Sequence, residues 1–222
     1  MRQDVSSQVV RRWPLEAPLK NVNEVKEPVA EQPTMAAHSD AVEAHHRFGS
    51  VHYKGAPWDL THLEAFPLRI DPGLGFEIDV IVLFSCHCFS HAIDHDDRLA
   101  AEIPRDELFE NTRERRVLNE ERYRLSRQFL PSLIRDLPNR KIQVSRSTPQ
   151  NFVVLEIADP SQTSKYAVFF NVEKDKRRSK RILLRVQSDY LLETITQRQK
   201  QAGKVIFDVL IRAAHEGRKI RC

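Results

Sequence analysis

Residues 84–97 bring together the side-chain types that most often bind metals or transfer protons. The segment contains two of the chain's three cysteines, three of its nine histidines and three aspartates. It directly follows the apolar run Ile78–Phe84, which predicts a buried strand. The reactive groups therefore crowd the carboxyl end of a strand, and residues in such connecting segments often carry binding or catalysis.

Cys86, Cys88, His91 and His95 have the spacing C-x-C-x2-H-x3-H. Zinc prefers thiolate and imidazole ligands and takes four of them in a tetrahedral arrangement. A helix that begins near Ser90 would place His91 and His95 one turn apart on the same face. One hypothesis is therefore a zinc site. The alternative is that the cysteines face the core and the histidines belong to a polar surface loop.

The same segment also allows two metal-free chemistries. Cys86 or Cys88 could be a nucleophile that a neighbouring imidazole activates. His91 and His95 could instead exchange protons with a ribose hydroxyl or a phosphate ester, while a nearby arginine such as Arg98 holds the phosphate. That second arrangement would suit metal-independent RNA cleavage. The residues expected to carry any catalysis are His91, His95 and Arg185. A charged, solvated loop without any chemistry is the competing interpretation.

A strongly basic segment lies between two predicted strands in the C-terminal third of the chain. A twisted hairpin with a basic tip can follow a phosphate backbone, although such tips also protect edge strands from aggregation. The residues predicted to contact phosphate are Lys174, Lys176, Arg177, Arg178, Lys180 and Arg181.

The strand after this segment carries a polar face, because successive side chains of a strand point to opposite sides. If that face is open, it offers a strip suited to a phosphate or a base, made of Arg185, Gln187, Ser188 and Tyr190. If a helix covers the face, Arg185 needs an acidic partner such as Glu156 or Glu173.

The elements that position these groups can be read from turn residues and from periodicity. Residues 58–70 predict a turn followed by a strand, Asp71–Gly75 a tight turn and Phe76–Phe84 a second strand, which together form a hairpin. A short helix or loop is expected over residues 99–112.

A long amphipathic helix is expected next, capped by Asn111 or Thr112, kinked by Pro131 and ended at Pro138. Four strands of an antiparallel meander should follow, at Lys141–Ser145, Phe152–Ile157, Lys165–Glu173 and Lys180–Ser188. The chain then predicts either a final helix with Gly217 as its cap or a final strand, Lys204–Ile211.

Composition limits the protein class. The 222 residues carry a net charge of +4, with the positive excess after residue 50, which favours a polyanionic partner. There is no glycine-rich nucleotide-binding motif and no apolar run long enough for a membrane span. Two cysteines spaced C-x-C plus one at the C-terminus are not a secreted disulfide framework, so we expect a cytoplasmic protein.

The sequence therefore predicts an α+β fold with a mainly antiparallel sheet and one long helix packed on it. Residues 1–46, rich in polar residues and proline, are expected to form a disordered tail that could bind a protein partner, and residues 47–222 a single domain. From about Asn111 to Tyr190, the expected order of a helix and four antiparallel strands resembles the small ribonuclease-toxin fold of barnase-like and RelE-like nucleases.

The favoured function is interaction with nucleic acid, RNA above DNA, by a ribonuclease-like toxin or a protein of a mobile element. No cofactor is needed in this hypothesis, and whether the protein is an enzyme stays open. The alternative is a non-enzymatic structural or interaction module that holds zinc through Cys86, Cys88, His91 and His95.

Overall fold

The computed structural model describes residues 47–144, 151–156, 165–192, 197, 201 and 203–220, with the backbone alone for 151–156. All of them belong to one compact unit, Ala41–Cys222. The tail expected over residues 1–46, with its possible protein partner, lies outside the described residues. No helix within the described ranges is long and apolar enough to cross a membrane.

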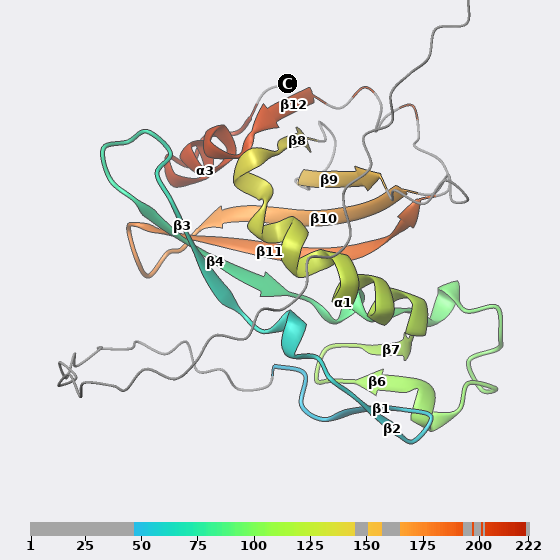
Figure 1. The fold of residues 1–222 in the computed structure, drawn as a ribbon. Coiled ribbons are helices and arrows are strands. Elements are labelled where there is room, and N and C mark those ends of the chain that lie inside the picture. The colour runs from blue at the N-terminus through green and yellow to red at the C-terminus, as the bar shows by residue number, and fades with distance from the viewer. Residues whose placement is uncertain are drawn as a thin grey trace, which may run out of the picture. The chain divides into compact units, whose positions relative to one another are not determined.

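A seven-stranded sheet forms the centre of the unit, in the order β12-β8-β9-β10-β11-β4-β3 (Figure 1). Its strands are β3 (Phe66–Ile70), β4 (Ile78–Phe84), β8 (Lys141–Val144), β9 (Asn151–Glu156), β10 (Lys165–Lys174), β11 (Arg181–Leu192) and β12 (Gly203–Ile206). Neighbouring strands are antiparallel, except that β11 pairs parallel with β4. The predicted α+β class, the β3–β4 hairpin and the meander from β8 to β11 are confirmed. The parallel pair was not predicted, because the two strands are far apart in sequence.

The long helix α1 (Glu120–Arg135) begins later than the sequence suggested. Asn119 is its cap, and the side chain of Asn119 accepts a hydrogen bond from the Arg122 amide at 2.8 Å. The start predicted at Asn111 or Thr112 is wrong, because Asn111 stabilises a turn instead and residues 115–118 pair as a strand. Pro131 lies inside the helix, which ends before Pro138.

The C-terminal segment combines both predicted interpretations. It forms the short strand β12 and then the helix α3 (Phe207–His215). Gly217 follows the helix with a φ of +68°, a left-handed conformation that glycine adopts at low energetic cost.

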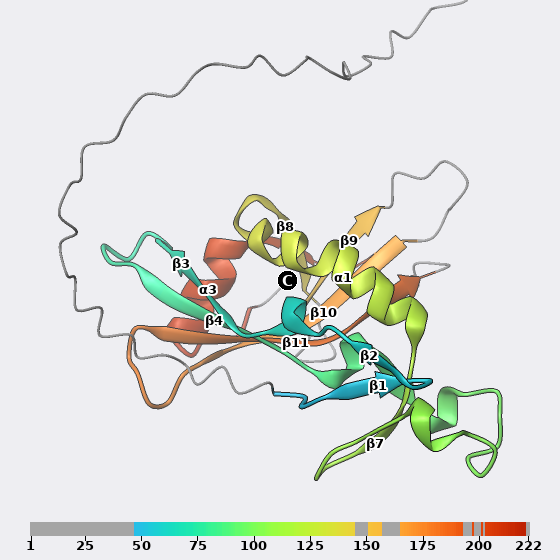
Figure 2. The same ribbon diagram turned by 60° about the horizontal axis from the view of Figure 1, so that its bottom comes forward.

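One face of the sheet is buried and the other is open. On β11, Ile182, Leu184 and Val186 are at most 1% exposed, whereas Leu183 and Arg185 between them are partly exposed. The helices α1 and α3 cover the buried face (Figures 1 and 2). Leu130, Ile134, Phe207 and Ile211 from these helices belong to the same hydrophobic core as the buried sheet residues. We call the opposite side the open face.

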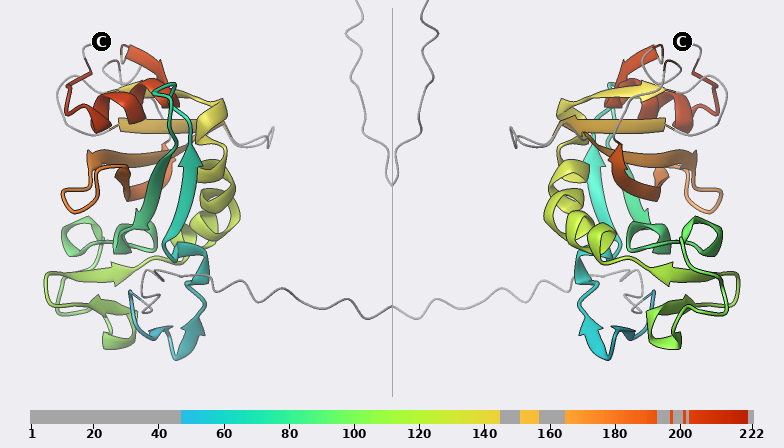
Figure 3. Two further views of the ribbon diagram at one scale, coloured as in Figure 1. Left: turned by 90° about the vertical axis from the view of Figure 1, so that its left-hand side faces the viewer. Right: turned by 90° about the vertical axis from the view of Figure 1, so that its right-hand side faces the viewer.

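Two small sheets lie beyond the carboxyl end of β4. One contains β5 (Ser90–Ala92), β7 (Arg115–Leu118) and β6 (Leu108–Glu110), with β7 in the middle, and the other contains β1 (Val51–Tyr53) and β2 (Ala56–Trp58). Figure 3 shows these sheets and α3 at opposite ends of the unit. The helix expected near Ser90 is replaced by β5, so His91 and His95 do not share a helical turn.

Candidate functional site

The segment rich in cysteine and histidine begins with one short turn at the end of β4. Residues Cys86–Cys88 form a single 3-10 turn, and the Ser85 hydroxyl accepts a hydrogen bond from the His87 amide. The same hydroxyl donates to the Gln187 carbonyl at 2.5 Å, which attaches the turn to β11. In this turn Cys88 is fully buried in the core, while the side chain of His87 is 37% exposed. The turn therefore separates the two cysteines into different surroundings.

Cys86, His87 and Glu114 meet beside this turn. The Cys86 thiol donates a hydrogen bond to Oε1 of Glu114 at 3.0 Å, and Nε2 of His87 lies 3.0 Å from Oε2 of the same carboxylate. The Arg116 guanidinium donates a hydrogen bond to Oε2 at 3.2 Å and so helps to hold the carboxylate in place. The three candidate ligand atoms all lie within 4.8 Å of one another. We refer to these three residues as the Cys–His–Glu cluster.

The protonation states in the Cys–His–Glu cluster follow from burial and from its charges. Burial, together with the Glu114 carboxylate, raises the pKa of the Cys86 thiol to about 12. Burial and the charge of Arg116 lower the pKa of His87. Burial alone would raise the pKa of Glu114, but hydrogen bonds from Cys86 and His87 hold it below its usual value. At neutral pH the cluster therefore contains a thiol, a neutral imidazole and a carboxylate, so the thiol is not activated as a nucleophile.

A cavity of about 730 Å³ opens next to this cluster, on the open face of the sheet. Three arginines line it from segments far apart in sequence: Arg47, Arg113 and Arg185. His87 and polar residues from the ends of β4 and β11 also line it, namely Ser85, Gln187 and Ser188, together with the apolar residues Leu83, Phe84 and Val186. We call this cavity the arginine pocket.

The arginines of this pocket repel one another. The pKa of Arg47 is lowered, first by partial burial and then by the charges of Arg185 and Arg113. Arg185 pairs with Glu173 at 2.6 Å, one of the two acidic partners that the sequence suggested for a helix-covered face, although this face is open. Within the ranges that the structure describes, no carboxylate pairs with Arg47 or Arg113. An anion in the pocket would relieve this repulsion.

The predicted catalytic histidines line a different cavity, of about 780 Å³, which we call the histidine pocket. In it, Nε2 of His91 lies 3.2 Å from Asp96, and Nδ1 of His91 lies 3.1 Å from the side-chain nitrogen of Asn119. His95 lines the same cavity, whereas Arg185 lines the arginine pocket and not this one. The structure therefore does not bring His91, His95 and Arg185 together in one pocket.

The four zinc ligands suggested by the sequence are also not brought together. Cys86 contacts Glu114, whereas the Cys88 thiol is buried near Asp189, and both burial and Asp189 raise the pKa of Cys88 well above its usual value. His91 is held by Asp96 and Asn119 instead. Across the described part of the chain, the grouping with metal-ligand geometry is the Cys–His–Glu cluster.

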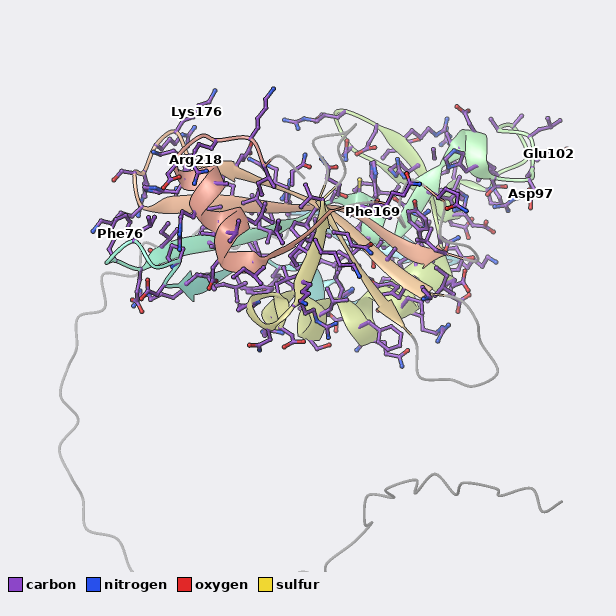
Figure 4. The ribbon with its side chains drawn as sticks, turned by 90° about the horizontal axis from the view of Figure 1, so that it is seen from above. Phe76, Asp97, Glu102, Phe169, Lys176 and Arg218 are labelled. Atoms are coloured by element: carbon purple, nitrogen blue, oxygen red, sulfur yellow. The ribbon has the colours of Figure 1, made fainter. Side chains whose placement is uncertain are left out.

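The basic hairpin tip is present between β10 and β11, with its own internal order. Asp175 is buried and accepts hydrogen bonds from the Arg177 amide and from the Arg181 side chain. The ammonium group of Lys180 lies over the ring of Phe76, 4.8 Å from its centroid. Figure 4 shows Lys176 and Phe76 at one end of the sheet and Asp97 at the other. Asp97 lines the histidine pocket, so the tip lies far from that pocket.

Aromatic side chains divide between the two faces by alternation along β10, while a register shift in β11 opposite Phe169 and Phe170 moves the later β11 residues to the other face. Tyr166 and Phe170 of β10 are fully buried, whereas Phe169 is partly exposed on the open face. The ring of Phe169 stacks on Tyr190 of β11 with centroids 5.2 Å apart. Of the β10 aromatic residues Tyr166, Phe169 and Phe170, Phe169 is therefore the one that reaches the open face.

Sequence reasoning missed Arg47, Arg113 and Glu114. Nothing in their spacing links them to Cys86 or Arg185, because they approach through the β6–β7 turn and through the segment before β1. The signal that was available is Asn111, a turn-forming residue just before Arg113 and Glu114. The sequence pattern predicts a helix cap at Asn111, whereas its side chain accepts hydrogen bonds within this turn.

Comparison with known proteins places the chain in a family. The YjaZ family model matches residues 50–215, a range that includes the Cys–His–Glu cluster. No curated protein and no solved structure matches the chain. The family name states no activity, so function has to be argued from the site.

Proposed function

The protein belongs to the YjaZ family, and we propose that it binds RNA across the open face of its seven-stranded sheet. The observation that carries the proposal is the arginine pocket, in which three guanidinium groups from distant segments surround one cavity. Positive groups that repel one another in the free protein are stabilised by an anionic ligand. Phosphate is such a ligand, and the planar guanidinium matches its oxygens.

The basic tip extends this surface along β11. Arg181 and Arg185 lie on the same side of the strand, as does Leu183 between them. Four residues of strand span about 13 Å, which is enough for successive phosphates of an extended chain. RNA that follows β11 would contact the tip and then the arginine pocket. The tip residues in this proposal are Lys174, Lys176, Arg177, Arg178, Lys180 and Arg181.

Single-stranded RNA fits the open face better than a duplex does. The stacked rings of Phe169 on β10 and Tyr190 on β11 offer a π surface to an unpaired base. Arg185 of the arginine pocket lies on β11 as well. Bases in a duplex are already stacked and cannot use such a surface. In this proposal the protein works in the cytoplasm, and Cys86 and Cys88 form no disulfide.

The test is a binding titration with labelled single-stranded RNA, followed by fluorescence anisotropy. Arg113→Ala and Arg185→Ala should each weaken binding about tenfold or more, because a hydrogen bond to a charged group contributes about 1.5–3 kcal/mol. Arg124→Ala is the matched control, since Arg124 is exposed on α1, which covers the opposite face.

Two results would contradict the proposal. One is wild-type affinity in both pocket variants, and the other is an equal loss in Arg124→Ala, which would indicate nonspecific attraction. The length of the RNA after incubation shows whether binding is accompanied by cleavage. If the RNA is cut, His91→Ala and His95→Ala should leave cleavage unchanged, because these two histidines line a different cavity from the arginine pocket.

A further inference from the structure

We propose that Cys86, His87 and Glu114 bind one zinc ion, whose fourth coordination position faces the arginine pocket. The site differs from the C-x-C-x2-H-x3-H set that the sequence suggested, because Cys88, His91 and His95 do not contribute to it. It does not depend on the RNA proposal, since metal binding can be measured without any nucleic acid.

The geometry of the Cys–His–Glu cluster is already close to that of a coordination shell. Sγ of Cys86 and Nε2 of His87 both point at the Glu114 carboxylate, each at 3.0 Å. In a tetrahedral zinc site, neighbouring ligand atoms are about 3.5 Å apart, given zinc–ligand bonds of about 2.0–2.3 Å. All three ligand atoms lie within 4.8 Å of one another, so side-chain rotations rather than backbone movements would close the shell.

The chemistry of the three donors suits zinc. Thiolate sulfur, imidazole nitrogen and a carboxylate oxygen are common zinc ligands, whereas magnesium and calcium prefer oxygen alone. On binding, a zinc–sulfur bond forms, the sulfur–hydrogen bond of Cys86 breaks and the proton leaves to solvent. His87 binds as the neutral imidazole and Glu114 as the carboxylate, so neither has to change its charge.

Supporting residues hold the ligands in place, as in established zinc sites. Arg116 is buried and contacts Oε2 of Glu114, and its side chain also donates to Ser90 at 2.9 Å. Ser85 fixes the turn that carries Cys86 and His87. Cys86 and His87 therefore lie in a turn that hydrogen bonds hold to β11, and Glu114 lies directly before β7.

Three protein ligands leave one position for water or for an anionic oxygen, the arrangement typical of catalytic rather than structural zinc. His87 lines the arginine pocket as well as belonging to the Cys–His–Glu cluster. An anion held by Arg47, Arg113 and Arg185 would therefore lie beside the ion. The positive charge of these arginines also disfavours a bare cation, which makes an anion the natural fourth ligand.

The experiment is a titration of the metal-free full-length protein with cobalt(II), followed by displacement with zinc. A Cys222→Ser background removes the third cysteine. One equivalent of cobalt should produce thiolate-to-cobalt charge-transfer absorption, and zinc should abolish it. Cys86→Ala should lose this absorption, and His87→Ala and Glu114→Gln should weaken cobalt binding roughly tenfold or more. Circular dichroism of each metal-free variant confirms its folding, and His87 is exposed enough for its replacement to leave the core intact.

The controls are Cys88→Ala and the double variant His91→Ala/His95→Ala, which should both bind cobalt like the parent. No charge-transfer absorption in the parent protein would overturn the proposal. Loss of binding in the two controls, with normal binding in His87→Ala and Glu114→Gln, would also overturn it and favour the C-x-C-x2-H-x3-H set.

Discussion

Asp189 is the residue with the most unusual surroundings outside the two pockets. It is fully buried on the covered face of β11 and accepts a hydrogen bond from the Tyr166 hydroxyl. Its second oxygen, Oδ1, has no hydrogen-bond partner within the described part of the chain. Burial raises the pKa of Asp189 to about 7, although Tyr166, Cys88 and Arg122 partly oppose this effect. The folded protein therefore holds a proton that the unfolded chain releases near pH 4.

We expect Asp189 to make the protein less stable as the pH rises from about 4 to 7. In this range the folded state binds one proton more than the unfolded state, so the free energy of unfolding falls as the pH rises. A pKa difference of about three units corresponds to roughly 4 kcal/mol. Asp189→Asn cannot titrate and should lose this dependence, which urea unfolding at several pH values would measure. Parallel pH profiles for the two proteins would contradict the expectation.

The pKa of the Cys86 thiol provides a second test at the residue scale. The Glu114 carboxylate raises it by accepting the thiol hydrogen bond and by its charge. Glu114→Gln removes the charge, so the thiolate should form at a lower pH, with a decrease of about one pKa unit. The ultraviolet absorbance of the thiolate in metal-free Cys222→Ser protein would measure it. Cys86→Ala, which should lack the transition, identifies the signal, and an unchanged pKa would show that burial alone sets it.

At the scale of elements, the start of α1 connects the two pockets. Asn119 caps the helix and also contacts His91. One turn further on, the Arg122 guanidinium donates to the carbonyls of His87 and Ser90 at 3.1 and 3.2 Å. The helix start therefore fixes both the turn of the Cys–His–Glu cluster and the strand that carries His91.

Asn119→Ala should lower the free energy of unfolding by about 1 kcal/mol, because the first turn of α1 loses its side-chain cap. Asn119→Ser keeps a capping oxygen but loses the contact with His91, so its stability should remain close to that of the wild type. Urea unfolding measures both variants. Equal destabilisation by both substitutions would show that the contact with His91, rather than the cap, is the stabilising interaction.

For the whole molecule, the proposed RNA surface extends from the hairpin tip to the arginine pocket. The two regions are joined by β11, whose open side between them is formed by alternating residues such as Arg181 and Arg185. The affinity for RNA should therefore depend on both regions together, because the sheet holds them at a fixed separation.

The salt dependence of RNA binding should report both regions. Each lost phosphate contact should reduce the slope of log affinity against log salt by about 0.7 for a single strand. Each of the two double variants, Arg47→Ala/Arg113→Ala and Lys176→Ala/Arg177→Ala, removes two such contacts. We therefore expect each of them to reduce the slope by about 1.4. Anisotropy titrations at several potassium chloride concentrations measure the slopes. A slope unchanged by the tip variant would confine RNA to the arginine pocket.

The sequence by itself determined the elements whose signals are local. Alternation along β10 and β11 separates Phe170 from Phe169, and the turn residues between Ile70 and Ile78 produce the first hairpin. These patterns depend on residues a few positions apart. Strands and turns can therefore be predicted from them without knowledge of the fold. The helix start was misplaced because Asn111 and Asn119 both suit a cap, and only strand pairing of the residues between them decides which one is used.

Only the tertiary structure decided which reactive groups meet. The parallel pairing of β4 with β11 brings Arg185 beside Leu83, and the β6–β7 turn delivers Arg113 and Glu114 to the same end of the sheet. Cys86 and Cys88 look equivalent in the sequence, yet one turn directs Cys86 to Glu114 and buries Cys88 against Asp189. Contacts between distant segments depend on the packing of the whole chain, and spacing along the sequence does not record them.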